Sequence, residues 1–143
     1  MHLIIDGYGG DPHGLADLEL VRALLDTVPH EMGMVKIAPP YVCRYEGPKP
    51  NDWGISGFVL IAESHLSVHT FPERGLLWAD IFSCRSFDAD RLVEAVREPF
   101  PYGRRGSPCW DGAWRTAKCW PRRLVAWHLP RENGRCMNYS VLL

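Results

Sequence analysis

The stretch from Ser56 to Cys84 combines apolar, strand-forming residues with side chains capable of acid–base or nucleophilic chemistry. The reactive side chains are Ser56, Glu63, Ser64, His65, His69, Glu73 and Cys84. A polar group buried without a partner typically costs about 1–3 kcal/mol, so an apolar stretch rarely gathers such groups without a function. The density of reactive groups therefore predicts a functional site here.

Three chemistries fit these side chains. The first is metal binding by His65 and His69 with Glu73 or Cys84. Zinc motifs with two nearby histidines place them on a helix, and the β-branched residues and proline of this stretch disfavour a helix, so we expect no metal. The second is an ordinary serine hydrolase, but the residues around Ser64 lack the glycines of a G-x-S-x-G turn. The third uses the Glu63–Ser64 peptide of the chain itself as the starting material for a cofactor.

Three motifs make the sequence similar to one enzyme family. Residues 63–73 read Glu-Ser-His-Leu-Ser-Val-His-Thr-Phe-Pro-Glu and resemble the processing site of the bacterial and archaeal S-adenosylmethionine decarboxylases. Residues 54–57, Gly-Ile-Ser-Gly, resemble that family's upstream Gly-Val-Ser-Gly. Residues 80–84, Asp-Ile-Phe-Ser-Cys, resemble its downstream Asp-Val-Phe-Thr-Cys. The resemblance covers roughly residues 1–98.

The resemblance implies that the chain cuts itself. Ser64 would attack the carbonyl of Glu63 and form an ester. β-Elimination would then split the chain into a β chain of residues 1–63 and an α chain of residues 64–143, and the new terminus at residue 64 would lose ammonia to become a pyruvoyl group. This self-generated group is the cofactor that the resemblance predicts.

The resemblance also assigns two residues that assist processing. Ser56 would stabilise the tetrahedral intermediate, and His69 would be the base for elimination. On a continuous strand, Ser64 and His69 would point to opposite faces, so their joint action requires a bend or bulge between them.

In the decarboxylation that the resemblance implies, the pyruvoyl ketone is an electron sink, joined to the substrate amine as a Schiff base. Cys84 would return a proton to the substrate, and Glu73, Trp53 and Leu66 would bind it. The product of S-adenosylmethionine would supply aminopropyl groups for spermidine and other polyamines.

The loop before residue 54 departs from the family pattern, because Pro50 stands near the expected aromatic residue. Trp53 or Tyr45 could replace that residue, since an aromatic face also suits a sulfonium cation. Asp52 and Glu46 in this loop could instead bind a guanidinium or ammonium group. A pyruvoyl-dependent arginine or ornithine decarboxylase is therefore the alternative.

The elements that must position these residues alternate between strands and helices. Apolar stripes and capping residues predict two helices, over Asp11–Asp26 and Asp88–Glu98. Residues 45–53 are rich in Pro, Gly and charged residues and predict a loop. Short apolar runs predict strands at Leu3–Ile5, Met34–Ile37, Phe58–Ala62, Leu66–Phe71, Leu76–Phe82, Leu124–Leu129 and Met137–Leu143. We expect an α/β (α+β) fold, a two-layer sandwich with one antiparallel sheet and both helices on one face.

The length of 143 residues and an apolar content of 46% predict a single domain with a real core. The formal charge of −1 and the lack of a long apolar run predict no nucleic-acid partner and no membrane segment. Five cysteines without a C-x-x-C pair, and an N-terminus unlike a signal peptide, favour a cytoplasmic protein with free thiols.

Residues 104–143 differ from the rest of the chain. They hold eight Lys or Arg against two acidic residues, and four of the six tryptophans. We expect this segment to complete the sheet, and a basic, Trp-bearing binding surface is the alternative. By resemblance the protein forms a homodimer with its site near the interface. The competing class is an unprocessed relative of the same fold that only binds or regulates a partner.

Overall fold

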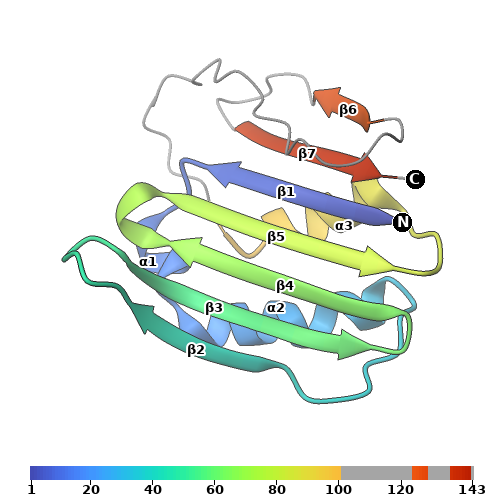
Figure 1. Cartoon of the computed structure of the whole chain (residues 1–143), viewed down its shortest axis with the longest axis horizontal. Coiled ribbons are helices and arrows are strands. Elements are labelled where there is room, and N and C mark those ends of the chain that lie inside the picture. Colours follow the sequence, from blue (N-terminus) through green and yellow to red (C-terminus); the bar gives the residue numbers. More distant parts are fainter. Residues whose placement is uncertain (101–123, 129–135, 143) are drawn as a thin grey trace.

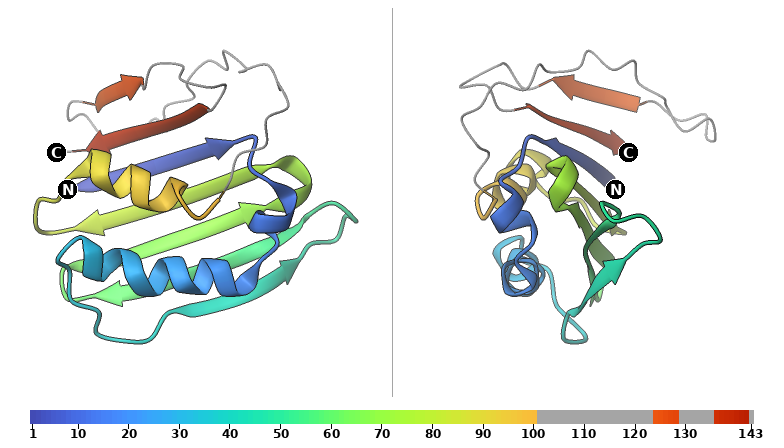
Figure 2. Two further views of the ribbon diagram at one scale, coloured as in Figure 1. Left: turned by 180° about the vertical axis from the view of Figure 1, so that it is seen from behind. Right: turned by 90° about the vertical axis from the view of Figure 1, so that its left-hand side faces the viewer.

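The computed structural model describes residues 1–100, 124–128 and 136–142. It has two layers, a seven-stranded antiparallel sheet and a layer of helices on one face (Figures 1 and 2). The strands are β1 (His2–Tyr8), β2 (Tyr41–Glu46), β3 (Trp53–Ile61), β4 (Ser64–Phe71), β5 (Leu76–Ser83), β6 (Leu124–His128) and β7 (Cys136–Leu142). The helices are α1 (Pro12–Leu15), α2 (Leu18–Glu31) and α3 (Ala89–Arg97), with a 3₁₀ turn η1 at Pro72–Arg74.

The strand order β2-β3-β4-β5-β1-β7-β6 places the motif-bearing strands side by side. β3, β4 and β5 form a meander joined by short turns, as Figure 1 shows. β1 pairs with β5 on one side and with β7 on the other. The basic C-terminal segment therefore contributes two strands to the same sheet, as its two apolar runs predicted.

The two-layer arrangement and the antiparallel sheet confirm the predicted fold. α2 and α3 lie on the same face of the sheet (Figure 2). The core between the layers consists of side chains from one face of each element, among them Leu3, Leu25, Val59, Val68, Ile81 and Val93, each fully buried. No helix of the described residues has the length and apolarity that crossing a membrane requires.

The limits predicted for the first helix were wrong. The helix expected over Asp11–Asp26 is two helices, because Asp17 caps a new one by accepting from the N–H groups of Glu19 and Leu20. This second helix also continues to Glu31, beyond the predicted end.

The strand expected at Met34–Ile37 is absent. In its place a single antiparallel bridge joins Lys36 to Ile61, because this segment pairs only with the end of β3, through the bonds from Ile37 N to the Leu60 carbonyl and from Ala62 N to the Val35 carbonyl. β2, in contrast, was not predicted. Its last two residues, Tyr45 and Glu46, lie in the segment that was expected to be a loop.

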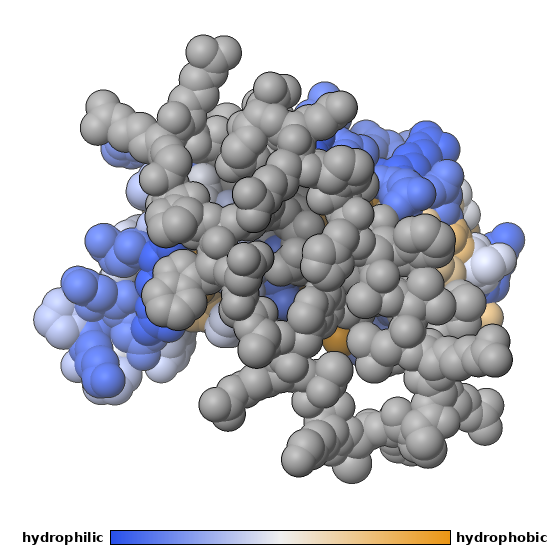
Figure 3. Space-filling model, turned by 90° about the horizontal axis from the view of Figure 1, so that it is seen from above, coloured by the Kyte–Doolittle hydropathy of each residue, from blue (hydrophilic) through white to orange (hydrophobic). Residues whose placement is uncertain are grey.

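The face of the sheet that the helices leave open carries large apolar side chains. They are between 36% and 60% exposed: Ile4, Tyr8, Tyr41, Tyr45, Phe58, Leu60, Trp78 and Phe82. Seen from above, the described residues that remain visible at the left and at the upper right of the view are largely hydrophilic (Figure 3). The open face of the sheet is therefore a candidate surface for a protein partner.

Candidate functional site

The hairpin between β3 and β4 presents Ser64 at the end of the sheet. Its turn is Ala62-Glu63, and β4 begins at Ser64. Two-residue hairpins normally need a positive φ within the turn. Here the positive φ, 153°, falls on Ser64, and no other non-glycine residue of the described part has one. The backbone strain of this hairpin is thus placed at the Glu63–Ser64 junction.

The carbonyl of Glu63 has a hydrogen-bond donor in place. The N–H of Cys84 donates to this oxygen at 3.1 Å, because β4 and β5 pair in register from Ser64 opposite Ser83. The exposed Cys84 thiol follows directly after this contact. The structure therefore brings three predicted site residues, Glu63, Ser64 and Cys84, to one place.

The Glu63 side chain is buried beside the junction. Its exposed fraction is 7%, and its Oε1 accepts from Arg85 Nη1 at 3.1 Å. Its Oε2 has no hydrogen-bond partner among the described residues. Arg85 was missed at the sequence level, although it directly follows the Asp-Ile-Phe-Ser-Cys motif.

The Ser64 hydroxyl contacts the imidazole of the next residue. Ser64 Oγ lies 3.0 Å from His65 Nδ1, and His65 Nε2 lies 3.3 Å from Asp80 Oδ1. The other oxygen of Asp80 lies 2.6 Å from His2 Nε2. His65 and Asp80 stand inside the quoted motifs, but the motifs alone gave them no role; register and side-chain geometry supply it.

A second polar group lies at the other end of β4. Ser56 on β3 pairs with His69 on β4, and Ser56 Oγ is 3.0 Å from His69 Nδ1. Trp53 Nε1 donates to Glu73 Oε1 at 3.3 Å. Gly54 makes the close strand approach possible, because a Cβ there would lie 1.7 Å from the carbonyl oxygen of Thr70.

Thr70 ties this end of the sheet to the helix layer. It is 1% exposed, accepts from the N–H of Ile55 at 3.0 Å and donates to the carbonyl of Leu15 at 2.7 Å. Thr70 thus holds β3, β4 and α1 together next to Ser56 and His69. It too lies within a recognised motif without having been singled out.

Within one chain, Ser64 and His69 are not brought together. They are five residues apart on a strand, or roughly 17 Å at about 3.3–3.4 Å per residue. The predicted bend or bulge between them is absent, since β4 pairs without interruption with β3 from Ser64 to His69 and with β5 from Ser64 to Phe71. His69 therefore belongs with Ser56, Trp53 and Glu73, and not with Ser64.

The remaining residues that were predicted to bind substrate differ in their contacts and in their burial. Asp52 pairs with Arg74 at 2.9 Å, and Glu46 pairs with Arg44 at 3.0 Å. The Arg44 guanidinium also lies 4.1 Å from the centre of the Trp53 ring. Leu66 is fully buried in the core, so its side chain is unavailable to a substrate on the open face.

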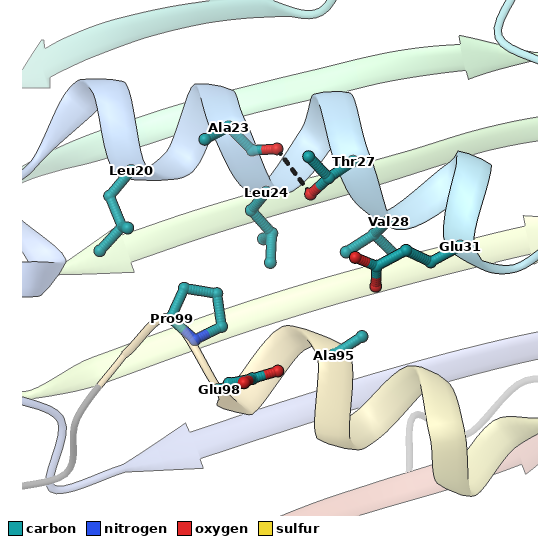
Figure 4. Close-up of a pocket in the computed structure, with 9 residues that line it drawn as sticks. All are labelled: Leu20, Ala23, Leu24, Thr27, Val28, Glu31, Ala95, Glu98 and Pro99. Carbon is teal, nitrogen blue, oxygen red and sulfur yellow. Dashed lines mark hydrogen bonds between the residues drawn. The ribbon is translucent and has the colours of Figure 1, made fainter.

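A hollow of about 240 Å³ between α2 and α3 lies apart from these groups (Figure 4). Leu24, Val28, Ala95 and Pro99 line it, and Glu31 and Glu98 flank it. The lining holds no imidazole or thiol; its polar groups are the two carboxylates and the hydroxyl of Thr27, which donates to the carbonyl of Ala23. The chemistry of the protein is therefore to be sought on the open face and at the β3–β4 turn.

Comparisons with known proteins agree with the motifs. The family model described as S-adenosylmethionine decarboxylase matches residues 1–105. The S-adenosylmethionine decarboxylase proenzyme of Archaeoglobus fulgidus is 39% identical over 96 residues, which cover 67% of this chain and 79% of that protein. The corresponding proenzyme of Pyrococcus furiosus is 30% identical over 100 residues, covering 69% and 68%.

A solved structure shares the fold as well. The adenosylmethionine decarboxylase from Aquifex aeolicus superposes with a TM-score of 0.57 at 30% identity, covering 68% of this chain and 77% of that one. The three motifs, the sheet that aligns them and these relatives lead to one conclusion: the chain belongs to the S-adenosylmethionine decarboxylase family.

Proposed function

We propose that this protein is a self-processing, pyruvoyl-dependent decarboxylase that acts on S-adenosylmethionine. The observation that supports this proposal most strongly is the hydrogen bond from the Cys84 N–H to the carbonyl of Glu63, next to the strained Ser64. A donor aimed at a carbonyl stabilises the negative charge that develops when a nucleophile attacks it.

The processing step follows from these neighbours. Attack of Ser64 Oγ on the Glu63 carbonyl carbon puts negative charge on the oxygen that Cys84 already contacts. Departure of the Ser64 nitrogen leaves an ester, and relieves the unfavourable φ of Ser64. Loss of the Ser64 α-proton then expels the Glu63 carboxylate and splits the chain after Glu63. The dehydroalanine left at residue 64 tautomerises to an imine, and water replaces the imine nitrogen, which leaves as ammonia, to give the pyruvoyl group.

The residues at the junction fit the pyruvoyl group that this reaction would leave. Ser64 is partly exposed at a strand end, so a group formed there is accessible to a substrate. When present, a pyruvoyl group withdraws the electron pair left by departing CO₂. Cys84, an exposed residue whose backbone N–H contacts the carbonyl of Glu63, would deliver the replacing proton from its thiol to the substrate α-carbon.

Ion pairs in the loop favour S-adenosylmethionine over a basic amino acid. Asp52 and Glu46, the carboxylates that could bind a guanidinium, are already paired with Arg74 and Arg44. A basic substrate would have to replace these arginines and bind close to their charges. The Arg44 guanidinium lies over one face of the Trp53 ring, so a sulfonium substrate would use the opposite face, next to the Glu73 carboxylate that Trp53 contacts.

A homodimer would complete the site. Ser64 and His69 lie at opposite ends of β4, and His65 and His69 both lie on the open, apolar face. A two-fold axis between two such faces, running across the middle of β4, exchanges the two strand ends. Ser64 of one subunit would then meet His69 and Ser56 of the partner subunit.

This arrangement accounts for the missing bulge, because the base for elimination would come from the second chain. A cytoplasmic location agrees with Cys43 and Cys84 being free thiols. In that compartment the product would supply aminopropyl groups for polyamine synthesis.

The test is release of labelled CO₂ from carboxyl-labelled S-adenosylmethionine, arginine and ornithine in parallel. We expect release from S-adenosylmethionine by the wild type and none from Ser64→Ala. Release from arginine or ornithine alone would assign the enzyme to the alternative substrate class. No release from any substrate would favour a non-catalytic binding protein.

A further inference from the structure

We propose that His65 is the base that activates Ser64 for chain cleavage, and that Asp80 positions it. This inference rests on the proposed self-processing and assigns a residue to its first step. The contacts are Ser64 Oγ to His65 Nδ1 at 3.0 Å and His65 Nε2 to Asp80 Oδ1 at 3.3 Å. They form a serine–histidine–carboxylate series that begins at the reacting hydroxyl.

The carboxylate determines which imidazole nitrogen is free. An ionised Asp80 only accepts hydrogen bonds, so His65 Nε2 must carry the proton in their contact. A neutral His65 then has its lone pair on Nδ1, directed at the Ser64 hydroxyl. The hydroxyl donates to Nδ1, which is the arrangement that a general base needs.

His2 and Phe82 hold this series in place. His2 Nε2 lies 2.6 Å from Asp80 Oδ2, so both carboxylate oxygens are occupied. The rings of His2 and His65 lie on either side of Phe82, with centroids 5.5 Å and 6.2 Å from it. In the described part of the chain these side chains do not converge as metal ligands do; the two imidazoles bind opposite oxygens of one carboxylate.

The register explains why the groups meet. His65 on β4 is opposite Phe82 on β5, and Phe82 is opposite His2 on β1. Asp80 lies two residues from Phe82 on the same face of β5. The open face thus aligns the three polar side chains beside the hairpin that carries Ser64.

The proton and bond changes balance. As the Ser64 Oγ–Glu63 carbon bond forms, the hydroxyl proton moves to His65 Nδ1. As the Glu63 carbon–Ser64 nitrogen bond breaks, the same proton passes to the departing nitrogen. The products are an ester and a free amine, and His65 returns to its neutral state.

The two steps of chain cleavage, ester formation and elimination, would then use different histidines. His65 would serve ester formation, and His69 of the partner subunit would serve the later elimination. An ester is cleaved by hydroxylamine, whereas an intact amide is not, so the two variants leave different products. His65→Ala should remain a single chain with or without hydroxylamine, and His69→Ala should split when hydroxylamine is added.

The experiment follows cleavage of freshly synthesised chain by denaturing mass spectrometry, with and without hydroxylamine. We expect His65→Ala to slow ester formation about 10²–10⁴-fold, the usual contribution of a general base. Added imidazole should restore part of the rate. His30→Asn, on the exposed side of α2, is the matched histidine control and should cleave like the wild type.

Asp80→Asn tests the positioning role without removing His65. It should also slow ester formation, and Asp80→Glu, which restores a carboxylate, should recover more of the rate. Cleavage of folded His65→Ala at the wild-type rate, or ester accumulation in it, would overturn the inference. If His65→Ala does not fold, wild-type cleavage of Asp80→Asn would overturn it. A wild type that never splits would instead refute the proposed function.

Discussion

At the Glu63–Ser64 junction, the groups that matter belong to both backbone and side chains. The N–H of Cys84 contacts the carbonyl of Glu63, and the side chain of the same, exposed residue is a free thiol. One residue therefore offers a backbone donor for cleavage and a side-chain acid for decarboxylation. Substitution of the side chain removes the acid and leaves the backbone donor in place.

Cys84→Ala is expected to cleave normally, because alanine keeps the backbone N–H. Its decarboxylation should fall by about 10²-fold or more, since the proton donor is lost. Intact mass measures the first effect and labelled CO₂ release the second. Full decarboxylation by Cys84→Ala would remove the thiol from the proton-donor role.

Asp6, on the open face of β1, gives a pH-dependent prediction. Burial raises the pKa of Asp6 above its ordinary value, because desolvation disfavours the charged carboxylate. As the pH rises, the Asp6 carboxyl therefore ionises in the unfolded chain before it ionises in the folded protein. The folded state loses stability as the pH rises above the ordinary pKa of an aspartate. Near Asp6, burial and the charge of this carboxylate raise the pKa of Tyr8 as well.

Asp6→Asn should therefore raise the melting temperature at pH 7, because asparagine removes a carboxylate that ionises more readily in the unfolded chain than in the folded protein. At pH 3 the two proteins should melt at similar temperatures, because the carboxyl is then protonated in both states. Thermal unfolding at the two pH values measures the difference. A lower melting temperature for the variant at pH 7 would show that the carboxylate is stabilising.

Among the elements, the sequence predicted β4, β5 and α3 more reliably than β2, β3 and the limits of the first helix. Short apolar runs identified the second half of β3 and most of β4 and β5, and the caps identified α3, which begins after Asp88 as expected. Asp11 and Asp17 are both helix caps, and one apolar stripe runs through both helices. Periodicity alone therefore could not show the break between them.

Asp17→Ala should destabilise the protein by about 1 kcal/mol, because the N–H groups of Glu19 and Leu20 lose their acceptor. Asp17→Asn is the matched control, since its side-chain oxygen can still accept. Chemical unfolding of both variants measures the difference. Equal stability of Asp17→Ala and the wild type would show that this cap contributes nothing measurable.

The candidate site could be predicted from the sequence only in part. Residue types and spacing identified Ser64, Cys84, Ser56 and His69 as candidates. Contacts made by the backbone, such as Cys84 to Glu63, leave no signature in residue type. The roughly 17 Å between Ser64 and His69 follows from strand register, which the motifs do not specify.

For the whole molecule, the open face of the sheet connects assembly to activity. Exposed apolar side chains on β3 and β5, such as Leu60 and Phe82, lie on the face that a second copy would cover. The account requires this copy, since one chain alone separates the nucleophile from the elimination base. Oligomeric state and processing should therefore change together.

Leu60→Lys should weaken the dimer, because it places a charge in an apolar interface. Sedimentation should show more monomer, and the elimination step should slow while the melting temperature changes little. His30→Lys, on the helix-covered side of the molecule, is the control and should remain dimeric. A Leu60→Lys monomer that eliminates normally would show that one chain suffices.

The most direct measurement of the central claim is the intact mass of the purified wild-type protein under denaturing conditions. The account predicts two chains that separate after Glu63, the second with a blocked first residue derived from Ser64, whereas Ser64→Ala stays whole. A wild-type preparation that remains a single 16.3 kDa species and does not react with carbonyl reagents would contradict it.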